Sequence, residues 1–579
     1  MTSRLAALLV TAASALATSS AAAPADGAAQ NADLIVINAD VYTSDAARPR
    51  AEAFAVSRGR IVMVGDGSTV RRYAGPDTRI IDAGGRTVTP GFIDGHSHVS
   101  GDAPRVSGVD LSYVADKAEW LRLIVAADQA LPAGEWLTGG YWDHTLSDGR
   151  YPDRAMLDAV VPDRPVFLKH IDGHYAWVNS KALVVAGVTA SSVVPPGGEI
   201  VLDERTGEPT GILLEGAMGL VSRMIPPRDG GRRREGLVQM QAYANRVGIT
   251  GLHQMGDLQD YLHVVETGRP SLRVWYGQIW SAGEDIPPAA AVRDILELRE
   301  RVAGRVAATG KTAASGPLLT VGYVKLMNDG VLSARTAVML EDYADQPGWR
   351  GEYIMEPGAL TAKVKAINAA GLPVAVHSIG DAAVRASLDA FEAAAAIRPR
   401  LPNRIEHIEV VTPADVRRFK RAGVLASMQP NHCTNAIGYV PSRLGPRRQG
   451  DAYVWRSMLS AGVPLVFGAD YPTSPLDPLT QIADAMFRSS PFGFAEGKPW
   501  FPEQALSFEE ALLAYTRTPA EATEWAAEIG SISPGRWADF VILSGRVPQP
   551  MDPSFRKLTV DATYLAGREV FSRLPVSGH

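Results

Sequence analysis

"TPGFIDGHSHVSGD", residues 89–102, places two of the chain's 11 histidines, His96 and His98, one residue apart after an apolar run and a glycine. On a β-strand, positions i and i+2 point to the same side of the sheet. Two imidazoles on one strand face could therefore bind a single divalent metal ion, each through one nitrogen. A hydrogen-bonded pair of turn histidines is the alternative, and the motif alone does not decide between the two.

The sequence after this motif alternates short apolar runs with alanine-rich helical segments, which is the βα rhythm of a parallel sheet. Seven or eight such units predict a (β/α)8 TIM-type barrel over residues 89–527. Residues 103–240 show little of this rhythm, so we expect an inserted subdomain after the first barrel strand. The later predicted strands are "GITGLHQMG", "LTVGYVKLMNDG", "LPVAVHSIG", "RIEHIEVV", "VLASMQP" and "VPLVFGAD". Thr412 is predicted to cap the helix in "TPADVRRFKRAG".

The two chain ends have a different pattern, with short β-branched runs separated by glycine and aspartate. Examples are "DLIVINADVYTSD" near the N-terminus and "PGRWADFVILSG" near the C-terminus. Isolated hairpins are only marginally stable in water. We expect the N-terminal strands to form a small antiparallel sheet. We therefore also expect residues 32–88 and 528–579 to pair into one composite β-sandwich domain.

Residues 1–23 have the layout of a secretory signal peptide: a single arginine, an apolar segment and small residues with Ala-x-Ala spacing. An alanine-rich tail is the alternative. The signal-peptide interpretation predicts a periplasmic or secreted protein. Cys433 is the only cysteine, so no intramolecular disulfide can form.

The overall charge restricts the partners. A formal net charge of -6 argues against a nucleic-acid-binding protein, which usually has a basic face or tail. After the first 30 residues no apolar run reaches the ~18 residues of a membrane span. We therefore expect a small-molecule substrate, no nucleic acid and no membrane span, and we leave the oligomeric state open, with a homodimer as the candidate.

Three further polar residues end predicted barrel strands, where packing would favour valine or isoleucine. They are His377, His407 and Asp470. In barrels of this kind, polar residues at the carboxyl ends of the strands face the active site. Packing does not readily produce this order of residues. Together with His96 and His98, these residues predict a metal site at the barrel mouth.

The sequence resembles the metal-dependent amidohydrolase superfamily, because "PGFIDGHSH" is similar to the first-strand signature of that superfamily. The blocks "DGHYAWVNSKAL", "VKLMNDGVLSARTA" and "VAVHSIGDAAV" more specifically resemble amidohydrolase family 3, the branch that contains N-substituted formamide deformylase. The resemblance runs in the family's order from about Asp33 to about Val570. It implies a chemistry class rather than a substrate.

The resemblance also implies a role for each ligand. His96 and His98 match the first-strand metal ligands. His377 and His407 match the ligands of the fifth and sixth strands. Asp470 matches the eighth-strand aspartate, which contacts the metal and acts as the catalytic proton shuttle.

Lys325, in "VGYVKLMNDG", stands where a carboxylated lysine would bridge two metals in a binuclear member of the family. A lysine at the end of an apolar strand is costly to bury as an ammonium. A pairing of Lys325 with Asp329 or another carboxylate is the alternative. The implied cofactor is one or two Zn²⁺ ions, with Mn²⁺, Fe²⁺ and Co²⁺ left open.

Five further residues are candidates for substrate binding. The insertion supplies Trp142 as part of an aromatic cap, and His170 and His174 in "KHIDGHYAWVNS". His253 follows in "GITGLHQMG", and Arg335 lies in "LSARTA". The alternatives are plain core packing for the aromatic residue and structural hydrogen bonds for the histidines.

These observations predict a metal-dependent hydrolase that cleaves an amide or related C–N bond. Ester or lactone hydrolysis, deamination on the same scaffold, and a non-catalytic binding or sensor protein are the alternatives. No Gly-x-Ser-x-Gly elbow occurs, which argues against a serine hydrolase. Cys433 and His432 are adjacent, and adjacent strand residues point to opposite faces, so a thiol nucleophile is poorly supported.

Overall fold

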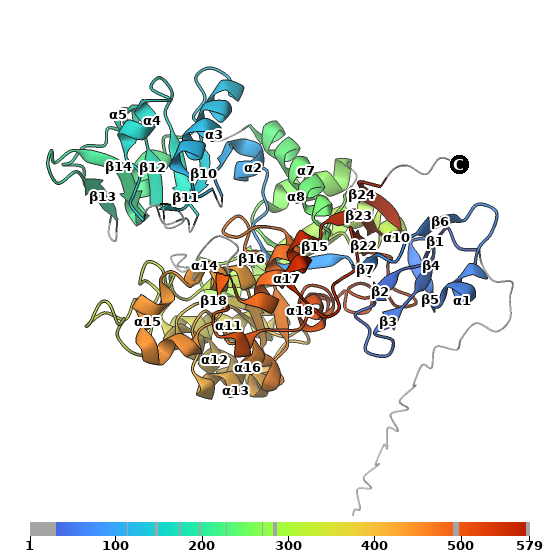
Figure 1. The fold of residues 1–579 in the computed structure, drawn as a ribbon. Helices are drawn as coiled ribbons and strands as arrows, with labels where there is room; N and C mark the ends of the chain where they lie inside the picture. Colours follow the sequence, from blue (N-terminus) through green and yellow to red (C-terminus); the bar gives the residue numbers. More distant parts are fainter. Residues whose placement is uncertain are drawn as a thin grey trace, which may run out of the picture.

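The computed structural model describes residues 31–574 apart from positions 113, 145–146, 148, 172, 174, 196–197, 227–228, 269, 282–285 and 490–496. The expected signal peptide at 1–23 and the candidate residue His174 lie outside the described residues. Figure 1 shows three parts: a barrel, an inserted lobe that faces it, and a β-rich part where the two chain ends meet.

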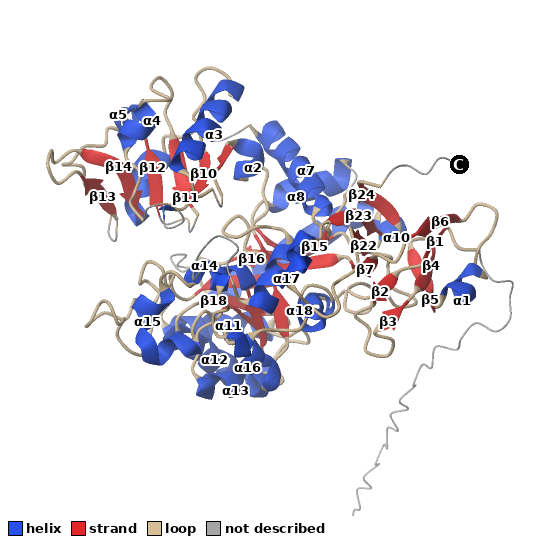
Figure 2. Ribbon diagram, viewed as in Figure 1, coloured by secondary structure: helices blue, strands red, loops and turns tan. Residues whose placement is uncertain are grey.

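Eight parallel strands form the central sheet, in the order β21-β20-β19-β18-β17-β16-β15-β8. The chain just after β21 closes the sheet into a barrel, because Asp470 N donates a 2.8 Å hydrogen bond to His96 O of β8 and Tyr471 forms a parallel bridge with Ser97. The strands are buried on both faces, because helices cover the outside of the sheet (Figure 2) and side chains from the strands fill the inside. The predicted (β/α)8 barrel is confirmed. The strands are β8 (Phe92–Ser97), β15 (Ile249–Met255), β16 (Arg273–Ile279), β17 (Leu319–Met327), β18 (Val374–Ser378), β19 (Arg404–His407), β20 (Leu425–Met428) and β21 (Leu465–Phe467).

The barrel helices begin and end where the local sequence dictates. Thr412 caps α13 (Pro413–Ala422) by accepting a hydrogen bond from Asp415 N, as predicted, and Gly423 ends the helix at a φ of 62°. Within the described ranges, no helix is both long and apolar enough to cross a membrane. The other main barrel helices are α7 (Gly230–Arg246), α8 (Leu258–Thr267), α9 (Pro288–Ala308), α11 (Pro357–Ala369), α12 (Asp381–Ala393), α14 (Pro430–Ala436), α16 (Trp455–Ser460), α17 (Pro478–Phe487) and α18 (Phe508–Ala514).

The two chain ends share one β-sandwich, as expected. A four-stranded sheet, β5-β4-β1-β6, packs on a six-stranded sheet, β24-β23-β22-β7-β2-β3, in which the C-terminal β22 pairs with the N-terminal β7. The expectation of an antiparallel N-terminal sheet is wrong in part, because β1 pairs with β6 and β2 with β7 in parallel. The strands are β1 (Leu34–Ile37), β2 (Asp40–Tyr42), β3 (Arg50–Ala51), β4 (Ala53–Ser57), β5 (Arg60–Gly65), β6 (Arg79–Asp82), β7 (Thr87–Pro90), β22 (Phe540–Leu543), β23 (Val560–Leu565) and β24 (Arg568–Ser572).

The segment between β8 and β15 forms a lobe with its own core. Its sheet has the order β13-β14-β12-β11-β10-β9, and the buried rings of Trp120, Trp142 and Trp177 lie within 6.2 Å of one another. Aromatic burial of this size supports a separate core. Its elements are α2 (Pro104–Ser107), β9 (Val109–Asp110), α3 (Lys117–Ala130), β10 (Gly139–Trp142), α4 (Arg154–Asp158), β11 (Phe167–His170), β12 (Tyr175–Val178), α5 (Ser180–Ala186), β13 (Glu199–Leu202), β14 (Pro209–Leu214) and α6 (Met218–Ser222).

A buried ion pair ties the sandwich to the barrel. Arg273, the first residue of β16, donates to both carboxylate oxygens of Asp539 at 2.6 and 2.7 Å. The remaining guanidinium nitrogen donates to the carbonyls of Ser315 and Pro317. Both charged side chains are buried, and their hydrogen-bonding groups are matched, which is the condition under which a buried pair is tolerated.

Candidate metal centre

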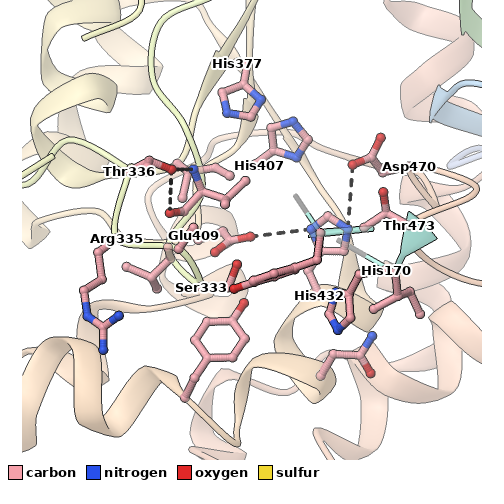
Figure 3. Close-up of a pocket in the computed structure, with 18 of the residues that line it drawn as sticks. His170, Ser333, Arg335, Thr336, His377, His407, Glu409, His432, Asp470 and Thr473 are labelled. Atoms are coloured by element: carbon pink, nitrogen blue, oxygen red, sulfur yellow. Dashed lines mark hydrogen bonds and ion pairs between the residues drawn. The ribbon is translucent and has the colours of Figure 1, made fainter. Parts of the chain in front are cut away.

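The carboxyl ends of the barrel strands meet at one cavity of about 800 Å³, which lies between the barrel and the inserted lobe. Figure 3 shows His377, His407 and Asp470 on the barrel side of this cavity and His170 from the insertion. The structure brings all the predicted metal ligands together here. The predicted ligands that line the cavity are His96, His98, Lys325, His377, His407 and Asp470.

Asp470 lies at the centre of this group. Its Oδ1 is 3.3 Å from His96 Nε2 and 3.4 Å from His98 Nε2. One ligand atom each from His96, His407 and Asp470 lie within 4.8 Å of one another. Nitrogen and oxygen ligands at ~2.0–2.1 Å from a tetrahedral ion are about 3.3 Å apart. The spacing therefore fits one divalent ion.

His96 lies between two carboxylates. Its Nδ1 is 2.7 Å from Glu406 Oε2, while its Nε2 faces Asp470 Oδ1. Burial and the Lys325 charge disfavour the imidazolium, yet Glu406 and Asp470 raise the pKa of His96 above its ordinary value. The arrangement therefore stabilises a cation between His96 and Asp470, either a proton or a metal ion.

Two other histidines are oriented by acceptors outside the cluster. His377 Nε2 is 3.0 Å from the carbonyl of Gly330, and His407 Nδ1 is 2.9 Å from Gln429 Oε1. Because both partner oxygens only accept, each of these ring nitrogens must carry the proton, which leaves the other nitrogen with its lone pair. Histidines that bind metals usually have their second nitrogen fixed in this way.

Lys325 is buried at the end of β17, and burial lowers the pKa of its amine to about 8. The negative charges of Glu406 and Asp470 oppose this shift. Among the described residues no ion pair joins Lys325 to Asp329, so that part of the alternative is absent, while the carboxylates whose charges act on Lys325 are Glu406 and Asp470. The Asp329 carboxylate instead accepts hydrogen bonds from the backbone N–H groups of Val338, Ile379 and Gly380.

Gly95 lets the first and last barrel strands approach each other. A Cβ at this position would lie 2.2 Å from Val466 Cγ1 and 2.8 Å from the carbonyl of Phe467. Asp94 fastens the same junction, since its carboxylate accepts hydrogen bonds from His96 N and Ala469 N. The glycine in "DGHSH" thus makes room beside the two histidines.

Two of the ligands have unusual backbone angles. His407 has a φ of 72° and Asp470 a φ of 55°, in the left-handed region that non-glycine residues rarely adopt. Such angles cost of order 1–3 kcal/mol and cluster at functional sites. At the ends of β19 and β21 they turn the side chains toward His96, whose ring centroid is 4.7 Å from that of His407.

Sequence reasoning missed three residues of this site: Glu406, Glu409 and His432. His432 Nδ1 is 3.6 Å from Glu409 Oε1 and its Nε2 is 3.8 Å from Asp470 Oδ2 (Figure 3). Its ring is parallel to that of His407 at 6.0 Å. The position of His432 just after the predicted strand "VLASMQP" was the available signal.

Cys433, which follows His432 in the sequence, does not reach the cavity. Its side chain is fully buried, and burial raises the pKa of its thiol to about 12. A thiol nucleophile needs a lowered pKa and access to substrate. The structure therefore supports the argument against a thiol hydrolase.

Two of the four described substrate-binding candidates line the cavity and two do not. His170 and Arg335 line the cavity, and Arg335 pairs with Asp345 at 2.9 Å. Trp142 is buried behind His170, with ring centroids 4.7 Å apart, and does not line the cavity. His253 lies apart from the lining residues, where Arg404 Nη1 is 2.7 Å from its Nδ1.

Comparison with known sequences gives matches over almost the whole chain. The profile of the Amidohydrolase family matches residues 79–571. Protein LONG AFTER FAR-RED 3 of Arabidopsis thaliana is 32% identical, over 92% of this chain and 90% of its own length. Putative amidohydrolase YtcJ of Bacillus subtilis is 31% identical (92% and 98%). N-substituted formamide deformylase of Arthrobacter pascens is 29% identical (91% and 96%).

Solved structures show the same architecture. An uncharacterized metal-dependent hydrolase from Pyrococcus furiosus superposes with a TM-score of 0.67 at 28% sequence identity. The match covers 88% of this chain and 98% of that chain. Barrel and additional sheets are thus shared over nearly the full length of both proteins.

Proposed function

The chain belongs to the amidohydrolase family and is a metal-dependent hydrolase that acts on C–N bonds; from this premise we propose that it cleaves a non-peptide amide, with Asp470 as proton shuttle. The position of Asp470 carries this proposal. One carboxylate oxygen faces His96 and His98, and the other faces His432 inside the cavity. A carboxylate so placed can exchange a proton with water and with a leaving group.

The donor set fits a divalent ion, because four imidazoles and one carboxylate line the same cavity and two of the histidines have their second nitrogen fixed. His96, His98, His377, His407 and Asp470 would hold it. The chemistry supplied by such an ion is polarisation of a carbonyl and acidification of water to a pKa of about 7. Zn²⁺ is the first choice, and Mn²⁺, Fe²⁺ and Co²⁺ suit the same ligands.

In the proposed reaction, the oxygen of water forms a bond to the amide carbon while Asp470 accepts the proton of that water. The C–N bond then breaks, and Asp470 delivers the proton to the departing nitrogen. The products are a carboxylic acid and an amine. His432 contacts the second oxygen of Asp470 and so positions the shuttle.

Lys325 is proposed to bind CO₂ as a carbamate. The ammonium first gives one proton to solvent. The resulting neutral amine forms an N–C bond to CO₂ and gives a second proton to solvent, so that an anionic oxygen ligand takes the place of a buried cation. Burial supports this step, because it disfavours the ammonium and lowers the pKa of Lys325 to about 8. A carbamate here would hold a second ion beside the first.

The substrate class is proposed from the relative that is an N-substituted formamide deformylase. We propose an N-substituted formamide or a similar small amide, with its substituent toward the inserted lobe. Ester or lactone cleavage uses the same groups and is the second class to assay. Export is proposed from residues 1–23, and sequencing the N-terminus of the mature protein tests it.

The test of function is a panel of N-substituted formamides, small amides, lactones and amino-purines with the zinc-loaded protein. We expect release of an amine and an acid, loss of activity on chelation, and recovery with Zn²⁺ or Co²⁺. Ammonia as the only product would favour a deaminase. Turnover that persists without any metal would contradict the proposal.

A further inference from the structure

A second group of metal-type side chains lies in the inserted lobe. Asp143, His144 and His170 all line the cavity. One ligand-type atom from each lies within 4.8 Å of the other two. His170 is 4% exposed, so the group is recessed rather than spread over the surface.

The fold of the lobe brings these residues to one edge. β10 and β11 are adjacent parallel strands, with Trp142 opposite His170 at their carboxyl ends. Asp143 and His144 follow directly after Trp142. The pairing shifts register between Gly140 and Trp142, and such a bulge re-aims the side chains that follow it. The barrel ligands are brought together in the same way, at the carboxyl ends of neighbouring parallel strands.

The distances match those between ligands of one ion. His170 Nε2 is 3.2 Å from His144 Nδ1 and 3.7 Å from Asp143 Oδ1. Ligand atoms ~2.0–2.1 Å from a tetrahedral ion are about 3.3 Å apart. The barrel centre has the same spacing, 3.3 and 3.4 Å from Asp470 to its two histidines.

Aromatic packing holds the ligands in place. The Trp142 ring packs edge-on against His170 at 4.7 Å, and Tyr175 does the same at 4.9 Å. The Trp142 indole is itself fixed by a 3.0 Å hydrogen bond to the carbonyl of Leu168. A rigid support of this kind is what a preformed binding site requires.

We propose that Asp143, His144 and His170 bind a divalent cation of the zinc class in the roof of the cavity, separate from the barrel centre. Three protein ligands leave one coordination position of a tetrahedral ion for water or for a polar group of the substrate. The roof ion would thus contact the same cavity in which the barrel centre acts. The roof site does not depend on the reaction assigned to the barrel.

Metal counting tests the roof site without any activity assay. The chelated full-length protein is reloaded with Zn²⁺, desalted and analysed for metal per chain. We expect His144→Gln and Asp143→Asn each to hold about one ion fewer than the parent protein, because each removes one of three ligands. Asp163→Asn, an exposed acid in the same lobe, should leave the count unchanged.

A barrel-blocked protein supplies an independent measurement. His96→Asn combined with His98→Asn should still bind one Co²⁺ with the visible absorption of a four-coordinate site, and added His144→Gln should remove that absorption. Circular dichroism identifies any variant that does not fold. If one of His144→Gln and Asp143→Asn does not fold, the metal count of the other decides whether the roof site binds an ion. Equal metal counts in the parent, His144→Gln and Asp143→Asn proteins would overturn the roof site.

Discussion

The Nδ1 atom of His96 lies 2.7 Å from Glu406 Oε2, and both side chains are buried. Burial opposes the ionised carboxylate, but Arg404 and His96 hold the pKa of Glu406 well below its usual range. Glu406 therefore accepts from Nδ1 and keeps Nε2 directed at Asp470. The orientation of one ligand thus depends on a residue from a strand far along the chain.

Glu406→Gln tests this orientation. The amide keeps the shape but loses the charge that fixes His96, so we expect metal affinity to fall by about 10–100-fold. Competition with a chelator of known affinity measures it. Glu297→Gln, which removes an exposed charge on α9 away from the cavity, is the control and should keep the affinity. Equal loss in both variants would point to general electrostatics rather than to orientation.

Asp470→Asn tests the proton shuttle. The amide cannot accept a proton from water, and removal of a general acid–base typically costs about 10²–10⁴-fold in turnover. We expect kcat to fall by that factor in a protein that is reloaded with metal. Metal content and kcat are to be measured on the same sample. Near-normal kcat at full metal content would show that another group moves the proton.

The buried pair between Arg273 and Asp539 should dominate the coupling of barrel and sandwich. Arg273→Ala leaves Asp539 as an uncompensated buried charge, so we expect a loss of about 3–5 kcal/mol in the free energy of unfolding. Denaturant titration measures it. Arg301→Ala, which breaks an exposed pair with Glu297, should change the free energy by about 0–1 kcal/mol. Similar losses in the two variants would contradict the argument.

Cys433 should be chemically silent in the folded protein. Burial raises the pKa of its thiol to about 12, and the reactive thiolate forms only as the pH approaches that value. At pH 8 we expect no alkylation by iodoacetamide until the protein is unfolded, and full activity after exposure to the reagent. Mass spectrometry with and without denaturant measures the labelling. Rapid labelling of the folded chain would show that the cavity opens to this residue.

The barrel and the metal ligands could be predicted because each ligand interrupts an apolar strand at its carboxyl end. β16 was not among the predicted strands, and its sequence "RVWYGQI" has no predicted metal ligand at its carboxyl end. Glu406 was not predicted as a site residue, because strand alternation would place it and His407 on opposite faces of the sheet. The left-handed φ of His407 breaks that alternation, and a local pattern does not reveal a backbone angle set by tertiary contacts.

The structure of the inserted lobe also could not be predicted from local sequence patterns. Its strands are short, and its sheet is stabilised by the packing of Trp120, Trp142 and Trp177, which are far apart in the sequence. No regular hydrophobic period in the sequence predicts such a sheet. The residues that face the barrel, such as His144, could be found only once β10 and β11 were placed side by side.

The pairing of β7 with β22 determines when the N-terminal strands can fold during synthesis of the chain. Val88 lies opposite Ile542, so the first strands of the chain complete their sheet only after almost the whole polypeptide has left the ribosome. Contacts so distant in sequence form slowly and late. Until then the apolar faces of β2 and β7 remain open, and a truncated nascent chain exposes them to aggregation.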